Sequence, residues 1–181
     1  NRWDFTDSVA DSVGGVTVTP VSTHAKVPSF ENGRIVLDGN TVYTLDTPIE
    51  FAATDNFKVV IKGKFNFDSS TGAGAKRIFG SASGVNSGIN YINIGTAQYG
   101  NGYAVSFSPK TSNWNGYVYL PDRAKFDMTE EHELSFMNYN RYLYVYMDGV
   151  LMSKRTTANS DDFLFTDFLG CSFITSGITY N

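Results

Sequence analysis

The segment 142–152 constrains the fold of this chain more than any other. It reads Tyr-Leu-Tyr-Val-Tyr-Met-Asp-Gly-Val-Leu-Met. Side chains along a β-strand point alternately to its two faces, so the aliphatic residues face one way and Tyr142, Tyr144 and Tyr146 the other. Asp148-Gly149 supplies the pair of positive-φ residues that a two-residue hairpin turn needs. This predicts a hairpin with an aliphatic core face and a tyrosine ladder, which forms either a second packed face or a solvent-facing platform.

Short apolar or β-branched runs alternate with clusters of Gly, Pro, Asn, Asp and Ser along the whole chain, as is typical of all-β proteins. The predicted strands are Val16–Pro20, Arg34–Leu37, Phe57–Phe67, Lys76–Gly80, Ile89–Ile94, Tyr103–Ser108, Tyr117–Leu120, His132–Asn138, Tyr142–Met147, Val150–Thr156 and Ser172–Tyr180. No convincing amphipathic helix is available to cover a sheet, so the strands must pack sheet on sheet. We therefore expect an all-β, two-sheet antiparallel jelly-roll sandwich that forms one domain, 1–181.

Composition and charge exclude several classes of protein. Aromatic residues make up 15% of the chain, unlike a disordered protein. The net charge is −4, without the basic surface that phosphate contacts need, so no nucleic-acid partner is expected. No apolar run approaches the ~20 residues of a membrane span. Cys171 is the only cysteine, which excludes internal disulfides. The chain starts at Asn1 without Met, so we expect it to be part of a longer polypeptide.

Several motifs follow one another from end to end of the chain. They are Trp3-Asp-Phe5 with Asp11-Ser-Val-Gly14, then Gly33-Arg-Ile-Val-Leu37-Asp38-Gly39, Asp55-Asn56-Phe57-Lys-Val-Val-Ile61, His132-Glu-Leu-Ser-Phe136 with Leu143-Tyr-Val-Tyr-Met-Asp148-Gly149, and Ile174 to Asn181. In order and spacing they resemble the laminin-G-like, concanavalin-A-like jelly-roll lectin domains. The resemblance implies one complete jelly-roll domain with a role in recognition.

Two departures from the resemblance bear on cofactors. Gly63 and Lys64 replace a tryptophan of the family pattern, and the closing strand lacks an acidic residue that in relatives often helps to hold structural calcium. Asp11 remains, but a calcium site needs six or more oxygen ligands. We expect no cofactor, although the resemblance leaves room for a structural calcium ion.

Catalytic motifs are missing from the sequence. Glycoside hydrolysis needs two carboxyl groups at a set separation, and the Glu-x-Asp-x-x-Glu pattern of related hydrolases does not occur. The only acidic cluster, Glu130-Glu131-His132-Glu133, reads as a solvated turn before a strand. His24 and His132 have no metal partner nearby in sequence and are expected in loops or at the surface. We therefore expect a binding protein; a hydrolase would need distant carboxylates to meet in a cleft.

Aromatic and amide side chains gather in the middle of the chain. Trp114 lies between two asparagines among turn-forming residues, so we expect it outside the deep core. Rings for sugar C–H groups and amides for sugar hydroxyls are what a saccharide site needs. The candidate ligand-binding residues are Trp114, Asn113, Asn115, Tyr117, Tyr119, Tyr99, Asn101 and Tyr91.

These features predict a non-catalytic module that binds neutral glycans, carried by a secreted, cell-surface or virion protein. If the strand with Tyr117 and Tyr119 adjoins the ladder of Tyr142, Tyr144 and Tyr146, the two make one aromatic platform. Tyrosine and tryptophan are also enriched at protein interfaces. A structural or adhesive domain that contacts another protein, with oligomerisation as one form, is therefore the alternative.

Overall fold

The computed structural model describes residues 13–20, 30–35, 42–64, 76–80, 91–96, 103–108, 117–119, 130–156, 163–174 and 177–179. All regular elements within these ranges are β-strands, and every strand pair is antiparallel. No helix in this part of the chain is long and apolar enough to cross a membrane.

Two large sheets contain most of the strands. The eight-stranded sheet has the order β1-β4-β13-β6-β7-β8-β9, with β14 paired to β13. Its strands are β1 (Val18–Pro20), β4 (Val42–Phe51), β6 (Lys76–Gly80), β7 (Tyr91–Thr96), β8 (Tyr103–Ser108), β9 (Tyr117–Tyr119), β13 (Phe163–Ile174) and β14 (Gly177–Thr179). The four-stranded sheet has the order β12 (Val150–Thr156), β11 (Tyr142–Met147), β10 (Glu131–Tyr139), β5 (Phe57–Lys64). A small hairpin pairs β2 (Phe30–Glu31) with β3 (Arg34–Ile35).

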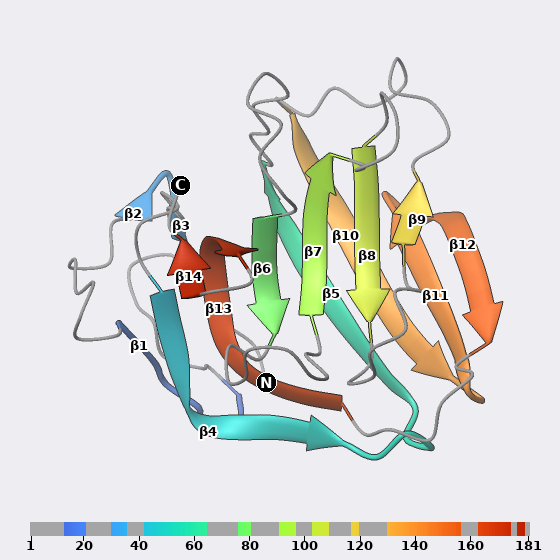
Figure 1. Cartoon of the computed structure of the whole chain (residues 1–181), viewed down its shortest axis with the longest axis horizontal. Helices are drawn as coiled ribbons and strands as arrows, with labels where there is room; N and C mark the ends of the chain where they lie inside the picture. Colours follow the sequence, from blue (N-terminus) through green and yellow to red (C-terminus); the bar gives the residue numbers. More distant parts are fainter. Residues whose placement is uncertain are drawn as a thin grey trace.

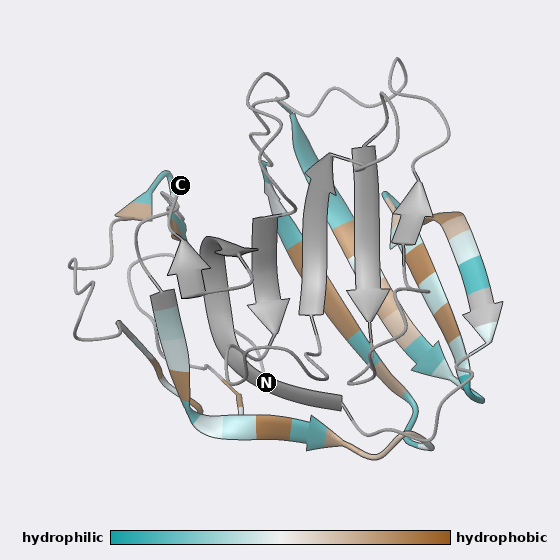
Figure 2. Cartoon of the chain, viewed as in Figure 1, coloured by the Kyte–Doolittle hydropathy of each residue, from teal (hydrophilic) through white to brown (hydrophobic). Residues whose placement is uncertain are grey.

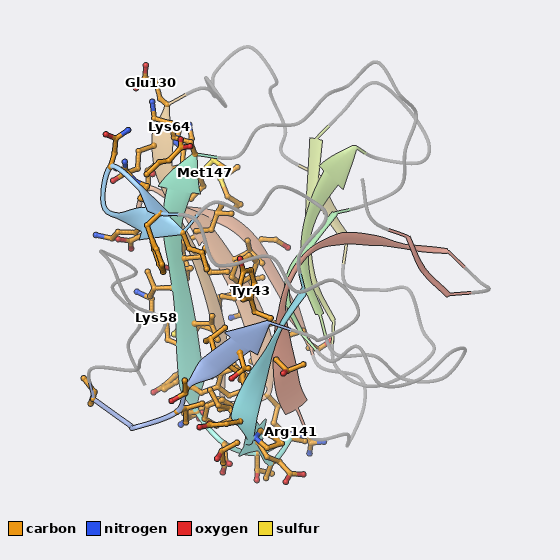
Figure 3. The ribbon with its side chains drawn as sticks, turned by 90° about the vertical axis from the view of Figure 1, so that its left-hand side faces the viewer. Tyr43, Lys58, Lys64, Glu130, Arg141 and Met147 are labelled. Carbon is orange, nitrogen blue, oxygen red and sulfur yellow. The ribbon has the colours of Figure 1, made fainter. Side chains whose placement is uncertain are left out.

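The two large sheets pack face to face. In Figure 1, strands β6 to β9 lie in front of β5, β10, β11 and β12, and the side view in Figure 3 separates them into two layers. Tyr43 and Met147 lie between the layers, and both are almost completely buried. The predicted two-sheet sandwich is confirmed.

The core depends on the alternation of buried and outward side chains in the four-stranded sheet. Along β10 and β11, every second side chain is buried, while the intervening ones are mostly half-buried or exposed. Figure 2 shows the same alternation as bands of apolar and polar residues. The buried apolar residues include Leu134, Phe136, Leu143, Val145 and Met147, together with Val16, Val18, Tyr43, Leu45, Ala53 and Phe57 from other elements. Burial of such side chains contributes roughly 1.5–3 kcal/mol each.

Tight turns join the strands of the four-stranded sheet where the sequence supplies residues that tolerate positive φ. Asp148 and Gly149 have φ of 49° and 77°, which confirms the predicted turn between β11 and β12. Asn140 and Arg141, with φ of 48° and 62°, make the corresponding turn between β10 and β11. Both turns keep neighbouring strands in local register.

Four predicted strands have the bounds that the structure shows, whereas β4 was missed and one predicted strand fails. Lys76–Gly80, Tyr103–Ser108, Tyr142–Met147 and Val150–Thr156 have the predicted bounds. Strand β4 was not predicted, and it contains Pro48, which cannot donate to a ladder. Pro48 lies in the register break between β4 and β13, where no ladder pair forms.

The single strand predicted over Ser172–Tyr180 is wrong. The chain instead folds back after Ile174, so β14 pairs antiparallel with the end of β13. The dipeptide Ser176-Gly177, a turn signal inside this run, marks the reversal in the sequence.

Candidate functional site

The outer face of the four-stranded sheet carries a continuous set of aromatic, aliphatic and lysine side chains. Its central row runs along β11 as Tyr142, Tyr144 and Tyr146, opposite to the buried residues of that strand. The neighbouring strands contribute Met137 and Tyr139 from β10, Val60 from β5, and Leu151 and Lys154 from β12. We call this set the tyrosine face.

Much of the tyrosine face is open to solvent. Tyr139 is 47% exposed, Tyr142 37%, Val60 45% and Leu151 49%. Tyr144 and Tyr146 are half-buried. A solvated sheet face usually carries polar side chains, and exposed aromatic and aliphatic groups that lie together commonly mark an interaction surface. The ladder is therefore a platform rather than a second packed face.

The three tyrosine rings form an ordered row. The ring centroids of Tyr142 and Tyr144 are 6.3 Å apart, with the planes tilted by 53°. Those of Tyr144 and Tyr146 are also 6.3 Å apart, but their planes differ by only 14°. Because the strand backbone fixes the spacing of these residues, their rings need little rearrangement to meet a ligand.

Lys154 lies over this row. Its Nζ is 4.3 Å from the ring centroid of Tyr142 and 5.4 Å from that of Tyr144, both within cation–π range. A β-bulge in β12 produces this position. The turn pairs Met147 with Val150 and Tyr146 with Leu151, but the register then shifts by one residue, so Lys154 pairs with Tyr144. Bulges re-aim side chains in this way.

The β5 edge of the same face is basic. Lys58, Lys62 and Lys64 alternate with the inward side chains of β5, and Figure 3 shows Lys58 on the side away from the eight-stranded sheet. Lys62 Nζ is 3.1 Å from Glu133 Oε2 on β10. The hydrogen bond from Lys62 holds the pKa of Glu133 below its ordinary value, against a smaller opposing effect of desolvation.

The acidic cluster is not a solvated turn, contrary to the expectation from sequence. Glu131 to Glu133 form the first residues of β10, because their alternation continues that of the strand. Glu131 makes an ion pair with Arg34 of β3, and Glu133 pairs with Lys62. Each of these two carboxylates is thus engaged by a cation.

His132 is buried rather than exposed, which corrects a second expectation. It is 9% exposed and lies on the inward face of β10 with Leu134. Its Nδ1 shares a 2.7 Å hydrogen bond with Asp148 Oδ2, and Asp148 Oδ1 accepts from the Glu133 backbone N–H at 2.9 Å. Partial burial raises the pKa of Asp148, but the hydrogen bonds from Glu133 and His132 outweigh it and lower that pKa below its ordinary value. This cluster anchors the turn between β11 and β12.

The structure does not test the residues predicted from sequence to bind a ligand. Asn113, Trp114, Asn115, Tyr99 and Asn101 lie outside the described residues. Tyr91 begins β7, and Tyr117 and Tyr119 bound β9; these strands are described, but the three side chains are not. Because β9 belongs to the eight-stranded sheet and β11 to the four-stranded one, these strands do not make one continuous aromatic face.

Sequence reasoning identified the ladder itself but missed Lys154 and Leu151 as its neighbours. The turn at Asp148-Gly149 signals a hairpin, from which the place of Leu151 opposite Tyr146 could have been derived. The bulge that places Lys154 has no such signal.

No group of three or more His, Cys, Asp or Glu side chains that could hold a metal ion occurs within the described ranges. Asp11, on which the expectation of calcium depends, lies outside them. Calcium binding therefore stays a prediction.

Comparison with known proteins identifies the fold. No family model matches the sequence, and no curated protein matches it. Domain 4 of AbnA, a GH43 extracellular arabinanase from Geobacillus stearothermophilus solved in complex with arabinotriose, has a TM-score of 0.52 at 13% identity, over 93% of this chain and 90% of that chain. The Emp47p carbohydrate recognition domain has a TM-score of 0.51 at 14% identity, over 92% and 85%.

A third similar structure was reported with endo-acting O-glycanases that members of the human gut microbiota use to initiate mucin breakdown. Its TM-score is 0.50 at 12% identity, over 96% of this chain and 86% of that chain. At such identities the likeness concerns the fold alone. The chain has an antiparallel two-sheet sandwich of jelly-roll type, consistent with the concanavalin-A-like lectin fold.

Proposed function

We propose that this chain is a non-catalytic, lectin-like module that binds glycans, with the tyrosine face as its binding surface. The observation that carries the proposal is the row of Tyr142, Tyr144 and Tyr146 on the solvent side of a sheet. Tyrosine offers an apolar ring for sugar C–H groups and a hydroxyl that both donates and accepts hydrogen bonds. The sandwich shared with a carbohydrate recognition domain supports the same proposal.

The two carboxylates of β10 that lie beside the tyrosine face support binding rather than hydrolysis. Hydrolysis needs two carboxyl groups that flank one glycosidic bond. On this face Glu131 pairs with Arg34, and Glu133 pairs with Lys62. A hydrolase remains the less favoured alternative, and release of reducing sugar from bound glycans would reveal it. We further propose that the module belongs to a longer secreted, cell-surface or virion protein, as its resemblance to lectin-like domains suggests.

A glycan array followed by calorimetry on the glycans retained tests the proposal. We expect Tyr144→Ala to weaken binding by roughly five- to thirtyfold, since loss of one ring contact costs on the order of 1–2 kcal/mol. Tyr144→Phe, which keeps the ring, should lose less. Thermal unfolding of each variant controls for folding. No binding by the wild type across a broad array would refute the proposed function.

The residues that the sequence predicts to bind a ligand provide the competing site. Trp114→Ala tests the group that also contains Asn113, Asn115, Tyr99, Asn101 and Tyr91. Loss of glycan binding in that variant, with binding by Tyr144→Ala unchanged, would move the site from the tyrosine face to the Trp114 group.

A protein interface is the second candidate function. The observation that favours it is the exposure of Val150 (60%) and Leu151 (49%) on β12, an edge strand of the four-stranded sheet. Light scattering tests the form of this interface that joins two copies: an oligomer that Leu151→Lys dissociates would support it, whereas a monomer would exclude self-association.

A further inference from the structure

We propose that the tyrosine face selects acidic saccharides, whose carboxylate or sulfate groups are received by Lys58 and Lys154 at opposite borders of the face. This inference rests on the proposed function and specifies its ligand class. It departs from the expectation of a neutral glycan, which rested on the family resemblance, on the low net charge and on the aromatic and amide side chains in the middle of the chain.

Three lysines of this face have no carboxylate partner among the described residues. Lys58, Lys64 and Lys154 are exposed, and none of them takes part in an ion pair within the described residues. The two carboxylates of this face are already engaged, Glu131 by Arg34 and Glu133 by Lys62. The face is therefore locally positive, although the chain as a whole carries a net charge of −4. A local field of this sign attracts anionic ligands in particular.

Lys58 and Lys154 lie at the two ends of one row of side chains across the sheet. The sheet register places Lys58, Met137, Tyr144 and Lys154 in one row across four strands. Neighbouring strands lie about 4.8 Å apart, so the backbones of Lys58 and Lys154 are separated by about 14 Å. A saccharide chain that crosses the strands along this row would meet an aliphatic and an aromatic side chain between two ammonium groups.

Two tyrosine rings hold the ammonium group of Lys154 in position. Its ammonium group lies 4.3 Å from the ring centroid of Tyr142 and 5.4 Å from that of Tyr144. Ring faces orient a cation without neutralising it. Lys154 thus combines a fixed position with an uncompensated charge, which is what an anion-binding group requires. The β12 bulge, which puts Lys154 opposite Tyr144, creates this arrangement.

A second copy of the chain fits this face less well. Two copies related by a two-fold axis through the tyrosine row would bring lysines of both copies into the same interface, and like charges there are unfavourable. An acidic peptide would satisfy the charges, but its backbone amides do not match a row of phenol rings as the alternating C–H and hydroxyl groups of a sugar do. Polyglutamate binding and the oligomeric state of the chain distinguish these two occupants from a saccharide.

The experiment compares acidic saccharides with neutral counterparts of the same backbone, and with an acidic polypeptide. Calorimetry measures binding of oligogalacturonate, of the same oligomer with its carboxylates methyl-esterified, and of polyglutamate of similar charge; dextran sulfate and neutral dextran repeat the comparison with a sulfated chain. We expect the acidic saccharides to bind about tenfold or more tightly than their neutral counterparts, because hydrogen bonds between charged groups are the stronger ones. Binding should weaken as salt rises.

Variants locate the effect on this face. Lys154→Gln and Lys58→Gln should each reduce the preference for the acidic oligomer several-fold, and the double variant should abolish it while binding of the ester is retained. Lys76→Gln in β6 removes the same charge from the other sheet and should change the preference little.

The outcomes separate this inference from the proposed function. Equal binding of acid and ester overturns the acidic preference but leaves glycan binding intact. Equal binding of polyglutamate and oligogalacturonate also overturns it, because the face then reads charge alone. Absence of all saccharide binding refutes the proposed function itself, and a lysine-dependent dimer in place of binding assigns the face to a second copy.

Discussion

Asn138 links strand β10 to the connection between β4 and β5. It is fully buried, and its Nδ2 donates to the backbone carbonyls of Ala53 at 3.1 Å and Asp55 at 2.8 Å. These carbonyls belong to the connection between β4 and β5, while Asn138 itself is on β10. The side chain therefore fixes the entry into β5, the basic border of the tyrosine face.

Replacing Asn138 by Asp removes the donor and directs a carboxylate at two carbonyl oxygens. We expect Asn138→Asp to lower the free energy of unfolding by about 2–4 kcal/mol at pH 7. The loss should shrink at pH 4, because burial favours the protonated acid. Urea unfolding at both pH values measures it. Asn32→Asp, the same change at an exposed turn, serves as the control; equal effects of the two variants would contradict the role of Asn138.

Asp148 makes the turn between β11 and β12 sensitive to acid. Its pKa in the folded protein lies below the ordinary value of 3.8, so its contribution to stability is present above that value and is lost as pH falls through the folded pKa. Asp148→Asn should therefore lower stability at pH 7 and reduce the further loss between pH 5 and pH 3. The effect should stay under about 1 kcal/mol, since the side chain is 44% exposed. Urea unfolding across this pH range with an unchanged difference between variant and wild type would contradict it.

At the scale of elements, two glycines of the four-stranded sheet have opposite requirements. Gly149 has a φ of 77°, whereas Gly63 in β5 has no positive φ, and neither has an atom within 4 Å of an added Cβ. Gly149→Ala should destabilise the protein by about 1–2 kcal/mol through backbone strain alone. Gly63→Ala should be neutral or stabilise by up to about 1 kcal/mol. Similar unfolding midpoints for the two variants would argue against the observed turn.

Elements set by local pattern were predictable, and those set by irregularity were not. The alternation in 142–147 and the Asp148-Gly149 turn are local signals, so strand, face and turn all agree with the structure. The bulge in β12 leaves no such trace. A simple hairpin register would pair Ser153 with Tyr144, whereas the shifted register pairs Lys154 with it. The lysine on which acidic selectivity depends thus could not be assigned to the tyrosine face from sequence.

At the scale of the molecule, the fold class could be predicted from the sequence, but which strands pair within each sheet could not. Alternating strands without covering helices imply two packed sheets. Which strands share a sheet depends on distant pairings, such as that of Phe57 with Asn138. For this reason the platform that combined Tyr117 and Tyr119 with the β11 tyrosines divides between two sheets. Trp114 lies outside the described residues, and its role in binding stays a prediction.

The proposed function requires that the tyrosine face is the surface that binds the glycan. An NMR titration of the intact chain with a glycan identified on the array tests this most directly, with tyrosine ring signals assigned through single Tyr→Phe variants. The account predicts that ring signals of Tyr144 and Tyr146 shift in a saturable way while the Trp114 indole signal stays in place. A saturable shift of the Trp114 indole, with the β11 tyrosine rings unchanged, would contradict it.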